Sequence, residues 1–327
     1  MKKNQRSVPL LLQDEEMRGI SRFLRQITFL VSLSLCPLSA QETEIWKYAV
    51  HQDLKAKPES YWEKELQSGV TLCFTGAFIS KSAEIQHTPP PRSVLILGRN
   101  KQIRWIPLIT FQNIAVGETV LGSEALRAKL RKNLEIFLSE NNDYAGVHLD
   151  FEGLNPSYRG DYKELLIEIR PVFRESGKVL SLALFPQEEF SKPLAAFHSS
   201  VFRQNLADEV VLMAYDLHSP KTVAGPVTKF SWAEKNIDLL LQFYKPNQVW
   251  LGLPLYGYYW ENGRRPPRLL TIGKDKDFAV QYGKESDGIR MIRTGRGEGS
   301  LILDDTRWKE YAKNLKLRGL AYWRLGF

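Results

Sequence analysis

The sequence contains little cysteine and lacks long apolar runs. Only two of its 327 residues are cysteine, Cys36 and Cys73, which excludes the disulfide framework that holds many small secreted domains together. No stretch of about 18 or more uncharged apolar residues occurs, so a bundle of membrane-spanning helices is excluded. The 22 glycines and 17 prolines are too few for a collagen-like or low-complexity chain. The fold must therefore depend on a hydrophobic core.

The composition is that of an ordinary folded protein. Hydrophobic residues make up 43% of the chain and charged residues 25%, which argues against wholesale disorder. The formal net charge of +8 is mild for this length and does not by itself indicate nucleic acid as a partner. Because domains commonly hold about 100–200 residues, the length indicates one large domain or two small ones.

Residues 1–40 have the pattern of a secretory signal peptide. An uncharged, largely apolar run at 27–35 follows three arginines between residues 18 and 25, and small residues follow it up to Ala40. A cationic start, a short apolar core and a small-residue cleavage site are typical of exported proteins. The acidic residues near the N-terminus suit such a leader poorly, so translation from Met17 is an alternative start. We therefore expect an exported protein, periplasmic, cell-wall-associated or extracellular.

Residues 1–40 also allow interpretations other than a cleaved signal peptide. Cys36 follows a sequence that loosely resembles a lipid-attachment motif, although Leu35 and Pro37 disfavour lipidation. A buried N-terminal helix or a membrane anchor is the structural alternative, but nine apolar residues are too short to span a bilayer. Removal of the leader leaves a chain with a formal charge of +5 and Cys73 as its single cysteine. We expect Cys73, which lies in an apolar run, to behave as a small buried hydrophobic residue.

From residue 44 on, short β-rich runs alternate with amphipathic helical patterns. The β-rich runs cover residues 44–50, 70–79, 103–111, 145–152, 179–186, 209–216, 248–256 and 318–324. The clearest helical patterns cover residues 123–141, 159–176, 197–207 and 231–244. Eight strands with helices between them predict an α/β fold, a (β/α)₈ TIM barrel over residues 41–327. A doubly wound open sheet is the alternative.

Two details refine this prediction. Ser123 precedes its helical pattern in the position of an N-cap, and Pro171 lies inside another helical pattern, where we expect a kink. Residues 257–317, between the seventh and eighth β-rich runs, are too long and too glycine-rich for one connecting helix. They predict a small α+β insertion at the rim of the barrel. A basic, proline-broken stretch at 262–268 is a solvated loop or, if functional, a contact for an anionic polymer.

The fourth β-rich run carries the most informative pattern. Side chains alternate between the two faces of a strand. One face of this run therefore carries Val147, Leu149 and Phe151, and the other carries His148, Asp150 and Glu152. In a parallel barrel the apolar face packs against the helices, so the polar set points into the barrel with Glu152 nearest its carboxyl-terminal mouth. Buried carboxylates are costly unless they are paired or used, which favours a functional site over a solvated edge strand.

This run resembles the active-site strand of glycoside hydrolase family 18, the chitinase-like hydrolases, whose pattern is D-G-x-D-x-D-x-E. Gly146, Asp150 and Glu152 match the pattern. Ala145 and His148 stand where the family has its first and second aspartates. This sequence therefore keeps the two acids nearest the mouth of the barrel but differs from the family at the two aspartate positions that precede them.

Three further stretches support the resemblance. Residues 213–216 (MAYD) are similar to the sixth strand of the family, 251–257 (LGLPLYG) to its seventh, and 319–326 (GLAYWRLG) to its eighth. An insertion before the eighth strand is also common in the family. The resemblance covers roughly residues 44–327 and is closest to bacterial spore-germination peptidoglycan hydrolases. It implies an enzyme that cleaves β-linked N-acetylglucosamine polymers, peptidoglycan or chitin.

The resemblance implies a role for each matching residue. Glu152 would protonate the glycosidic oxygen and later activate water, while the substrate's own acetamido carbonyl attacks the anomeric carbon. Asp150 would orient the acetamido N–H and stabilise the cationic intermediate, and Tyr215 would hydrogen-bond the acetamido carbonyl. Trp323 would form an apolar floor under the reacting sugar. The remaining candidates for the substrate site are Asp216, Tyr256, Met213 and His148.

Met213 and His148 also have structural interpretations. Met213 fits a barrel-filling residue, and a lone histidine is more often a satisfied core residue than a metal ligand. Because His148 lies below Asp150, we expect its imidazole to hydrogen-bond or pair with that carboxylate and to keep it ionised. A shift of the pH profile on replacement of His148 by aspartate would follow.

The resemblance implies no cofactor and no metal. We expect a monomer whose partner is an N-acetylglucosamine-containing polysaccharide or oligosaccharide rather than nucleic acid. The rival function is a non-catalytic glycan-binding barrel, a lectin or scaffold, which has no need of a buried acid. A metal-dependent hydrolase such as a deacetylase lacks a ligand cluster in this sequence. The choice between peptidoglycan and chitin, and between endo and exo cleavage, stays open here.

Overall fold

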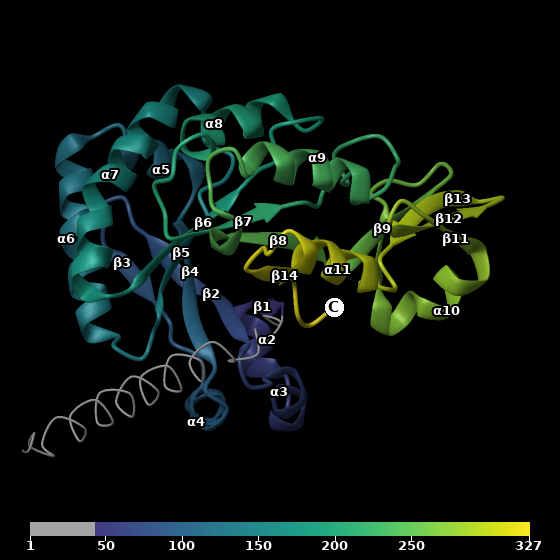
Figure 1. Cartoon of the computed structure of the whole chain (residues 1–327), viewed down its shortest axis with the longest axis horizontal. Coiled ribbons are helices and arrows are strands. Elements are labelled where there is room, and N and C mark those ends of the chain that lie inside the picture. Colours follow the sequence, from purple (N-terminus) through teal and green to yellow (C-terminus); the bar gives the residue numbers. More distant parts are fainter. Residues whose placement is uncertain (1–42) are drawn as a thin grey trace, which may run out of the picture. The chain divides into compact units, whose positions relative to one another are not determined.

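The computed structural model describes residues 43–327, which form one compact unit, Thr43–Phe327 (Figure 1). The predicted signal peptide and Cys36 lie outside the described residues. Within the described part, no helix is long and apolar enough to cross a membrane.

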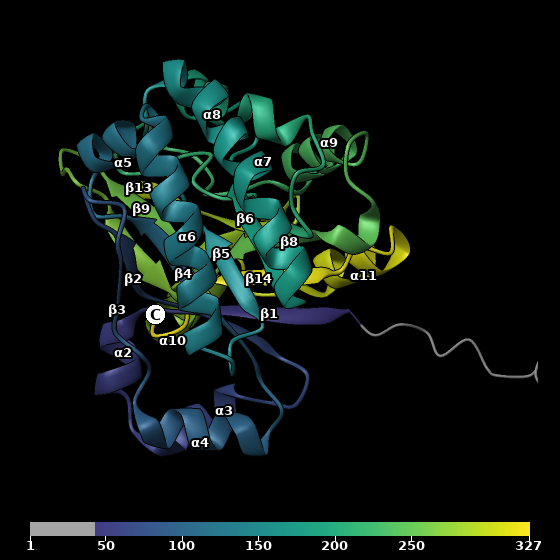
Figure 2. The same cartoon turned by 90° about the vertical axis from the view of Figure 1, so that its left-hand side faces the viewer.

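The centre of the unit is a closed barrel of eight parallel strands (Figures 1 and 2). The strands are β1 (Glu44–Ala49), β2 (Thr71–Ile79), β4 (Arg104–Phe111), β5 (Gly146–Leu149), β6 (Val179–Leu184), β7 (Glu209–Met213), β8 (Val249–Pro254) and β14 (Gly319–Trp323). β1 pairs in parallel with both β14 and β2, so the sheet closes on itself. This closure confirms the predicted TIM barrel and rules out the open sheet. A short strand, β3 (Ile85–His87), adds to β2 in the antiparallel direction.

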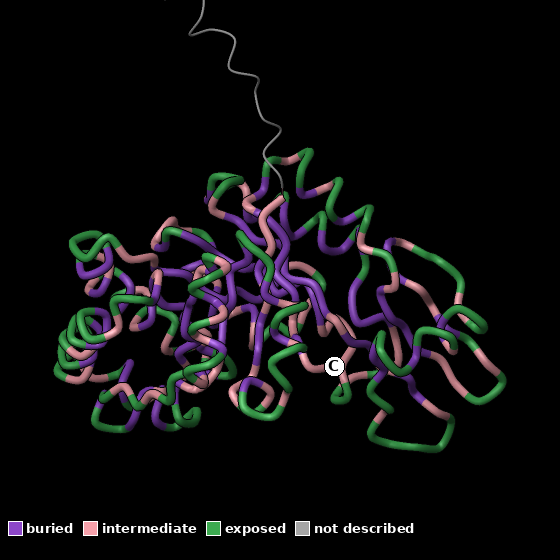
Figure 3. The backbone as a smooth tube through the Cα atoms, turned by 90° about the horizontal axis from the view of Figure 1, so that it is seen from below, coloured by how far each residue is buried: buried purple, intermediate pink, exposed green. Residues whose placement is uncertain are grey.

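Helices cover the outside of the barrel (Figure 2). They are α2 (His51–Ala56), α3 (Glu59–Glu65), α4 (Arg92–Asn100), α5 (Ile114–Leu121), α6 (Glu124–Glu140), α7 (Arg159–Ser176), α8 (Lys192–Phe202), α9 (Phe230–Leu240) and α11 (Thr306–Asn314), with short 3₁₀ turns η1 (Pro156–Tyr158) and η2 (Pro246–Gln248). The outward side chains of the strands pack against the apolar stripes of these helices, so the strands are buried while the helices keep exposed outer faces (Figure 3).

All four predicted helices are present, and two of them have shifted boundaries. α9 ends at Leu240, about four residues before the end of the predicted range. Ser123 caps α6, because its Oγ accepts a hydrogen bond from the Leu126 N–H at 3.4 Å. α7 has the predicted span, and Pro171 lies inside it without ending it. α8 begins at Lys192 and ends at Phe202, about five residues before the predicted range at each end. Pro193 in its first turn fits a helix start, since the fixed φ of proline suits that position.

The insertion is a five-stranded antiparallel sheet between β8 and β14. It contains β9 (Tyr256–Glu261), β10 (Arg268–Thr271), α10 (Ile272–Tyr282), β11 (Gly283–Ser286), β12 (Ile289–Thr294) and β13 (Gly297–Leu301), in the sheet order β10-β9-β13-β12-β11. It has a small core of its own, built around Tyr259, Leu270 and Ile292. The predicted insertion is thus confirmed, but it ends near residue 301, because α11 belongs to the barrel.

The interior of the barrel is filled by large side chains. Trp46, Tyr48, Ile106 and Trp250 lie there, and Cys73 is fully buried beside them as predicted. This packing makes the barrel a solid support for residues at its carboxyl-terminal mouth.

The amino-terminal end of the barrel is held by a buried ion pair. Glu209 accepts two hydrogen bonds from the Arg104 guanidinium, at 3.0 and 2.6 Å, and a third from Nε1 of Trp250 at 2.9 Å. The Glu209 side chain is only 4% exposed. The hydrogen bonds on several sides of its oxygens offset the cost of burying this carboxylate.

Candidate active site

β5 lies against β6 more closely than a side chain at Gly146 would permit. A Cβ atom built on Gly146 would lie 1.9 Å from the Val179 carbonyl oxygen. Glycine at this position therefore allows the two strands to pair in the observed register, Gly146 opposite Val179. Val147 and Leu149 join the outer hydrophobic layer, so the alternation predicted from the sequence is correct and the intervening side chains face inward.

His148 is a fully buried part of the barrel interior. Its Nε2 lies 3.0 Å from the Tyr48 hydroxyl, and its Nδ1 lies 2.9 Å from Oγ of Ser181. Trp46 packs edge-on against the imidazole, with ring centroids 5.2 Å apart. Burial lowers the pKa of His148 to about 3, so the ring is neutral at ordinary pH.

The predictions that His148 pairs with Asp150 and that it contributes to the substrate site are therefore wrong. Its ring nitrogens are engaged by Tyr48 and Ser181, which leaves neither to hydrogen-bond or pair with Asp150. Its exposed fraction is 0%, so it lies beneath the site rather than on a surface that a sugar can touch. The core interpretation of this histidine is the one that the structure supports.

Asp150 and Glu152 follow β5 at the mouth of the barrel, and each changes the pKa of the other. A hydrogen bond joins the two carboxyl groups. Glu152 is open to a pocket, whereas Oδ1 of Asp150 is buried and has no hydrogen-bond partner among the described residues. The site thus presents an accessible acid with a second, more enclosed acid below it.

The pKa values of both carboxyl groups are raised. For Glu152 the largest cause is the loss of hydration between the pocket walls, followed by the charge of Asp150 and the hydrogen bond between them. For Asp150 the cause is burial, which the same hydrogen bond opposes. The expectation that Asp150 ionises more readily is thus wrong. The hydrogen bond favours a proton on Glu152 and the charge on Asp150, the distribution that an acid catalyst needs.

Tyr215 and Met213 form an apolar cluster beside the acid pair. They pack with Ala183 and Phe185, and Trp323 packs against the cluster from the end of β14. Burial and the nearby carboxylates Asp150 and Glu152 raise the pKa of Tyr215, so its hydroxyl stays protonated and can donate a hydrogen bond. The structure therefore places Tyr215 beside the acids and Trp323 against the cluster that contains Tyr215.

Asp216 is held by a tyrosine of the insertion. The Tyr256 hydroxyl donates to Oδ1 of Asp216 at 2.6 Å. Asp216 has a left-handed backbone with φ of 56°, a conformation that non-glycine residues adopt mainly where the surroundings fix it. Burial raises the pKa of Asp216, and the hydrogen bonds from Tyr256 and Tyr258 oppose that rise. Tyr256 is only 3% exposed. Its burial fits a residue that positions Asp216 better than a residue that contacts a sugar directly.

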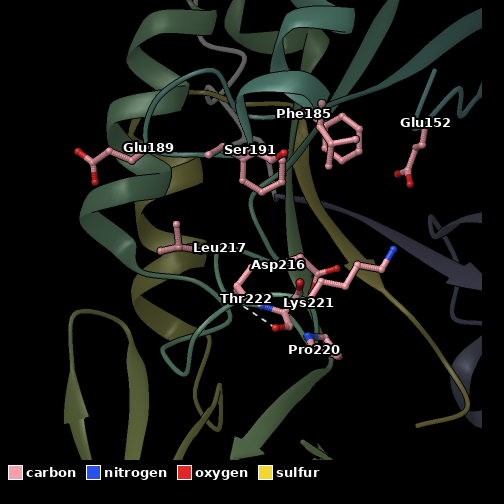
Figure 4. Close-up of a pocket in the computed structure, with 13 residues that line it drawn as sticks. Glu152, Phe185, Glu189, Ser191, Asp216, Leu217, Pro220, Lys221 and Thr222 are labelled. Carbon is pink, nitrogen blue, oxygen red and sulfur yellow. Dashed lines mark hydrogen bonds between the residues drawn. The ribbon is translucent and has the colours of Figure 1, made fainter. Parts of the chain in front are cut away.

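The pocket beside these residues has a volume of about 720 Å³ (Figure 4). It lies at the carboxyl ends of β5, β6 and β7, the end at which TIM barrels carry their active sites. Glu152 and Asp216 line it. The other residues in its wall come from the segments after these strands: Gly153, Phe185, Glu189, Phe190, Ser191, Leu194, Leu217, Ser219, Pro220, Lys221 and Thr222.

Sequence reasoning missed most of this wall. Phe185 and Phe190 stack with ring centroids 5.4 Å apart and form an apolar side of the pocket. Lys221 and Glu189 add charges to it. The available signal was position alone, since these residues lie at the end of the fifth β-rich run or in the segments after the fifth and sixth runs, where barrel loops carry function.

A family model decides the identity of this barrel. The model described as "Glycosyl hydrolases family 18" matches residues 118–327, more than half of the chain and every strand from β5 onward. The chain belongs to glycosyl hydrolases family 18. The match includes the acid pair, Tyr215, Asp216 and Trp323, so the resemblance drawn from the sequence is confirmed at the level of the family.

Several known proteins and solved structures are similar to this chain. The "Cortical fragment-lytic enzyme" of Bacillus subtilis is 24% identical over 281 residues, which are 78% of this chain and 65% of that protein. Among solved structures, the spore cortex-lytic enzyme SleL of Bacillus megaterium has a TM-score of 0.71 at 18% identity and covers 88% of this chain and 71% of its own. A chitinase of Chromobacterium violaceum has a TM-score of 0.72 at 15% identity, over 87% and 94% of the two chains. These structures support the fold.

The family 18 barrel contains no metal-binding cluster in its described part. Across residues 43–327, no group of three or more His, Cys, Asp and Glu side chains is arranged to hold a metal ion.

Proposed function

We propose that this protein is an exported glycoside hydrolase that cleaves β-linked glycans containing N-acetylglucosamine, with peptidoglycan preferred to chitin. The observation that carries the proposal is the acid pair. Glu152 opens into the pocket with a raised pKa, and the hydrogen-bonded carboxyl of Asp150 lies behind it. A lectin has no need of such a pair, whereas a glycosidase needs a proton donor that is still protonated near its working pH.

The first chemical step breaks the glycosidic bond. Glu152 gives its proton to the glycosidic oxygen, and the carbonyl oxygen of the substrate's acetamido group bonds to the anomeric carbon as the leaving sugar departs. Asp150 accepts a hydrogen bond from the acetamido N–H and balances the positive charge of the oxazolinium ring. The protonated hydroxyl of Tyr215 donates a hydrogen bond to the acetamido group. The enzyme itself supplies no nucleophile.

The second step restores the enzyme. The carboxylate of Glu152, now deprotonated, takes a proton from water, and the water oxygen bonds to the anomeric carbon while the acetamido carbonyl leaves it. Two displacements on the same carbon retain its configuration. Trp323 packs beside Tyr215 and offers an apolar surface under the reacting sugar.

The preference for peptidoglycan is supported by the names of the relatives. One is described as a cortical fragment-lytic enzyme and another as a spore cortex-lytic enzyme, although a chitinase has a similar fold. Export is supported by the pattern of residues 1–40 alone. A cell-wall substrate and an exported enzyme are consistent with each other.

Turnover by the purified protein tests the proposal. Peptidoglycan sacculi and chitooligosaccharides are incubated with the wild type and with Glu152→Gln, and the released reducing ends are analysed. We expect cleavage by the wild type and a loss of about a hundredfold to ten-thousandfold in Glu152→Gln, the usual contribution of a general acid. Glu164→Gln, on the exposed face of α7, is the matched control and should leave activity unchanged. Binding without turnover by the wild type would instead favour a lectin.

A further inference from the structure

The pocket wall contains one cation among several acids. Glu152, Glu189 and Asp216 contribute carboxyl groups, and Lys221 is the single basic residue in the wall of this pocket within the described part of the chain. Its side chain extends toward the side of the pocket on which Glu152 lies in Figure 4. A charged group in a substrate pocket needs a counter-ion from the protein or from the ligand.

Two of the three acids already have other partners. Asp216 accepts the hydrogen bond from Tyr256 at 2.6 Å, and Glu189 pairs with Lys235 at 3.0 Å. Lys221 takes part in no ion pair with any residue between 43 and 327. Its ammonium group is therefore available to an anion on the substrate.

A tight turn fixes the backbone that presents Lys221. The Thr222 N–H donates to the Ser219 carbonyl at 2.9 Å, and the Ser219 N–H donates to Oγ1 of Thr222 at 3.0 Å. Pro220 occupies the second position of this turn, where its fixed φ is favourable. Lys221 follows as the third residue, so the turn places it at the pocket before any ligand binds.

The surface around the turn suits a sugar that bears both apolar and anionic groups. Phe185, Phe190, Leu194 and Leu217 line the same pocket as Lys221. Aromatic and aliphatic walls accept sugar faces and methyl groups. An ammonium group beside such a wall is suited to a carboxylate that is attached to a short apolar branch.

We propose that Lys221 is a specificity-determining residue that binds a carboxylate of the glycan, so that the pocket favours strands whose N-acetylmuramic acid carries no stem peptide over neutral chitin. The lactyl ether of N-acetylmuramic acid carries a methyl group and a carboxyl group, whereas chitin has no anion to offer. This inference rests on the proposed function and names its substrate class.

The test compares three glycans of equal length. The first is peptidoglycan strand freed of its stem peptides, which exposes the lactyl carboxylates; the second is the same strand after methylamidation of those carboxylates; the third is a chitooligosaccharide. We expect Lys221→Ala to raise KM for the first glycan roughly five- to tenfold with little change in kcat, because an accessible ion pair contributes modestly to binding. KM for the other two should not change, and Lys221→Arg should restore much of the lost affinity.

Controls separate this role from a structural one. Lys132→Ala removes an exposed lysine from α6 and should leave all three KM values unchanged. An equal loss on all three glycans, or no loss on the carboxylate-bearing strand, overturns the inference and leaves the proposed hydrolase standing. A wild type that cleaves none of the glycans overturns the proposed function and the inference together, so the two failures are distinguishable.

Discussion

Replacement of Asp150 by asparagine tests the electrostatic coupling on which the proposed acid depends. The charge of Asp150 is one of the causes that raise the pKa of Glu152. Asparagine removes that charge and keeps the size of the side chain. The pKa of Glu152 should therefore fall, and the basic limb of the pH–activity profile should move to lower pH, since the active enzyme requires protonated Glu152.

The closeness of the two carboxyl groups gives the size of this shift. Because they are hydrogen-bonded, their charges lie within about 4 Å, at which two unit charges interact by about 4 kcal/mol at an effective dielectric constant of about 20. Solvent in the open pocket weakens this interaction. We therefore expect a shift of about one pH unit, with about three as the upper limit.

The measurement is kcat/KM across the acidic and neutral range for the wild type and Asp150→Asn. The variant should also be slower by about a hundredfold or more, because the charge that stabilises the cationic intermediate is lost. Asp143→Asn, an exposed residue of the loop before β5, makes the same change in net charge and should move neither the rate nor the profile. A basic limb that stays in place in Asp150→Asn would refute the coupling.

Three further predictions concern stability. Burial lowers the pKa of His148 from 6.5 to about 3 and the pKa of His198 from 6.5 to about 4. Because the pKa values are lower in the folded protein, the stability that the neutral rings contribute is fully present above pH 6.5. That stability is lost as the pH falls below 6.5. Each histidine should cost about 2 kcal/mol at about pH 5, and urea titrations at several pH values should show a weaker pH dependence in His148→Asn than in the wild type. Gly146→Ala should destabilise the fold by about 3 kcal/mol or more because its Cβ meets the backbone of β6, whereas Gly160→Ala, in open space on α7, should be neutral or stabilise by up to about 1 kcal/mol; equal midpoints in chemical denaturation would contradict this. Glu209→Ala should cost about 3–5 kcal/mol by leaving Arg104 without its buried partner, and a variant that retains wild-type thermal stability would show that the pair contributes nothing.

The barrel could be predicted because its signals are local and repeated. Each of the eight barrel strands is a short apolar run, and between most of them the sequence has a helical period, so these eight strands followed from patterning alone. The insertion was recognised as a departure from this rhythm, but its individual strands were not. β11 has the sequence GKES and lies largely exposed, and such a strand carries no hydrophobic alternation to reveal it.

The site was predictable where one strand carries it and unpredictable where several elements meet. The inward direction of Asp150 and Glu152 follows from alternation within a single run. The partners of His148 come from β1 and β6, which are distant in sequence, so the imidazole was assigned to the nearest acid instead. Lys221 lies in a turn between elements, and only its place in the folded pocket distinguishes it from other surface lysines.

The stereochemistry of the first product is the most direct test of the proposed substrate-assisted mechanism. Glu189 and Asp216 line the same pocket as Glu152, so a second carboxylate acting as a base for water is the geometric alternative, and that mechanism inverts the anomeric carbon. Proton NMR of the reducing sugar, recorded before mutarotation, distinguishes the two. We expect the β anomer to form first, because the acetamido group of the substrate is the nucleophile. Initial release of the α anomer would contradict it.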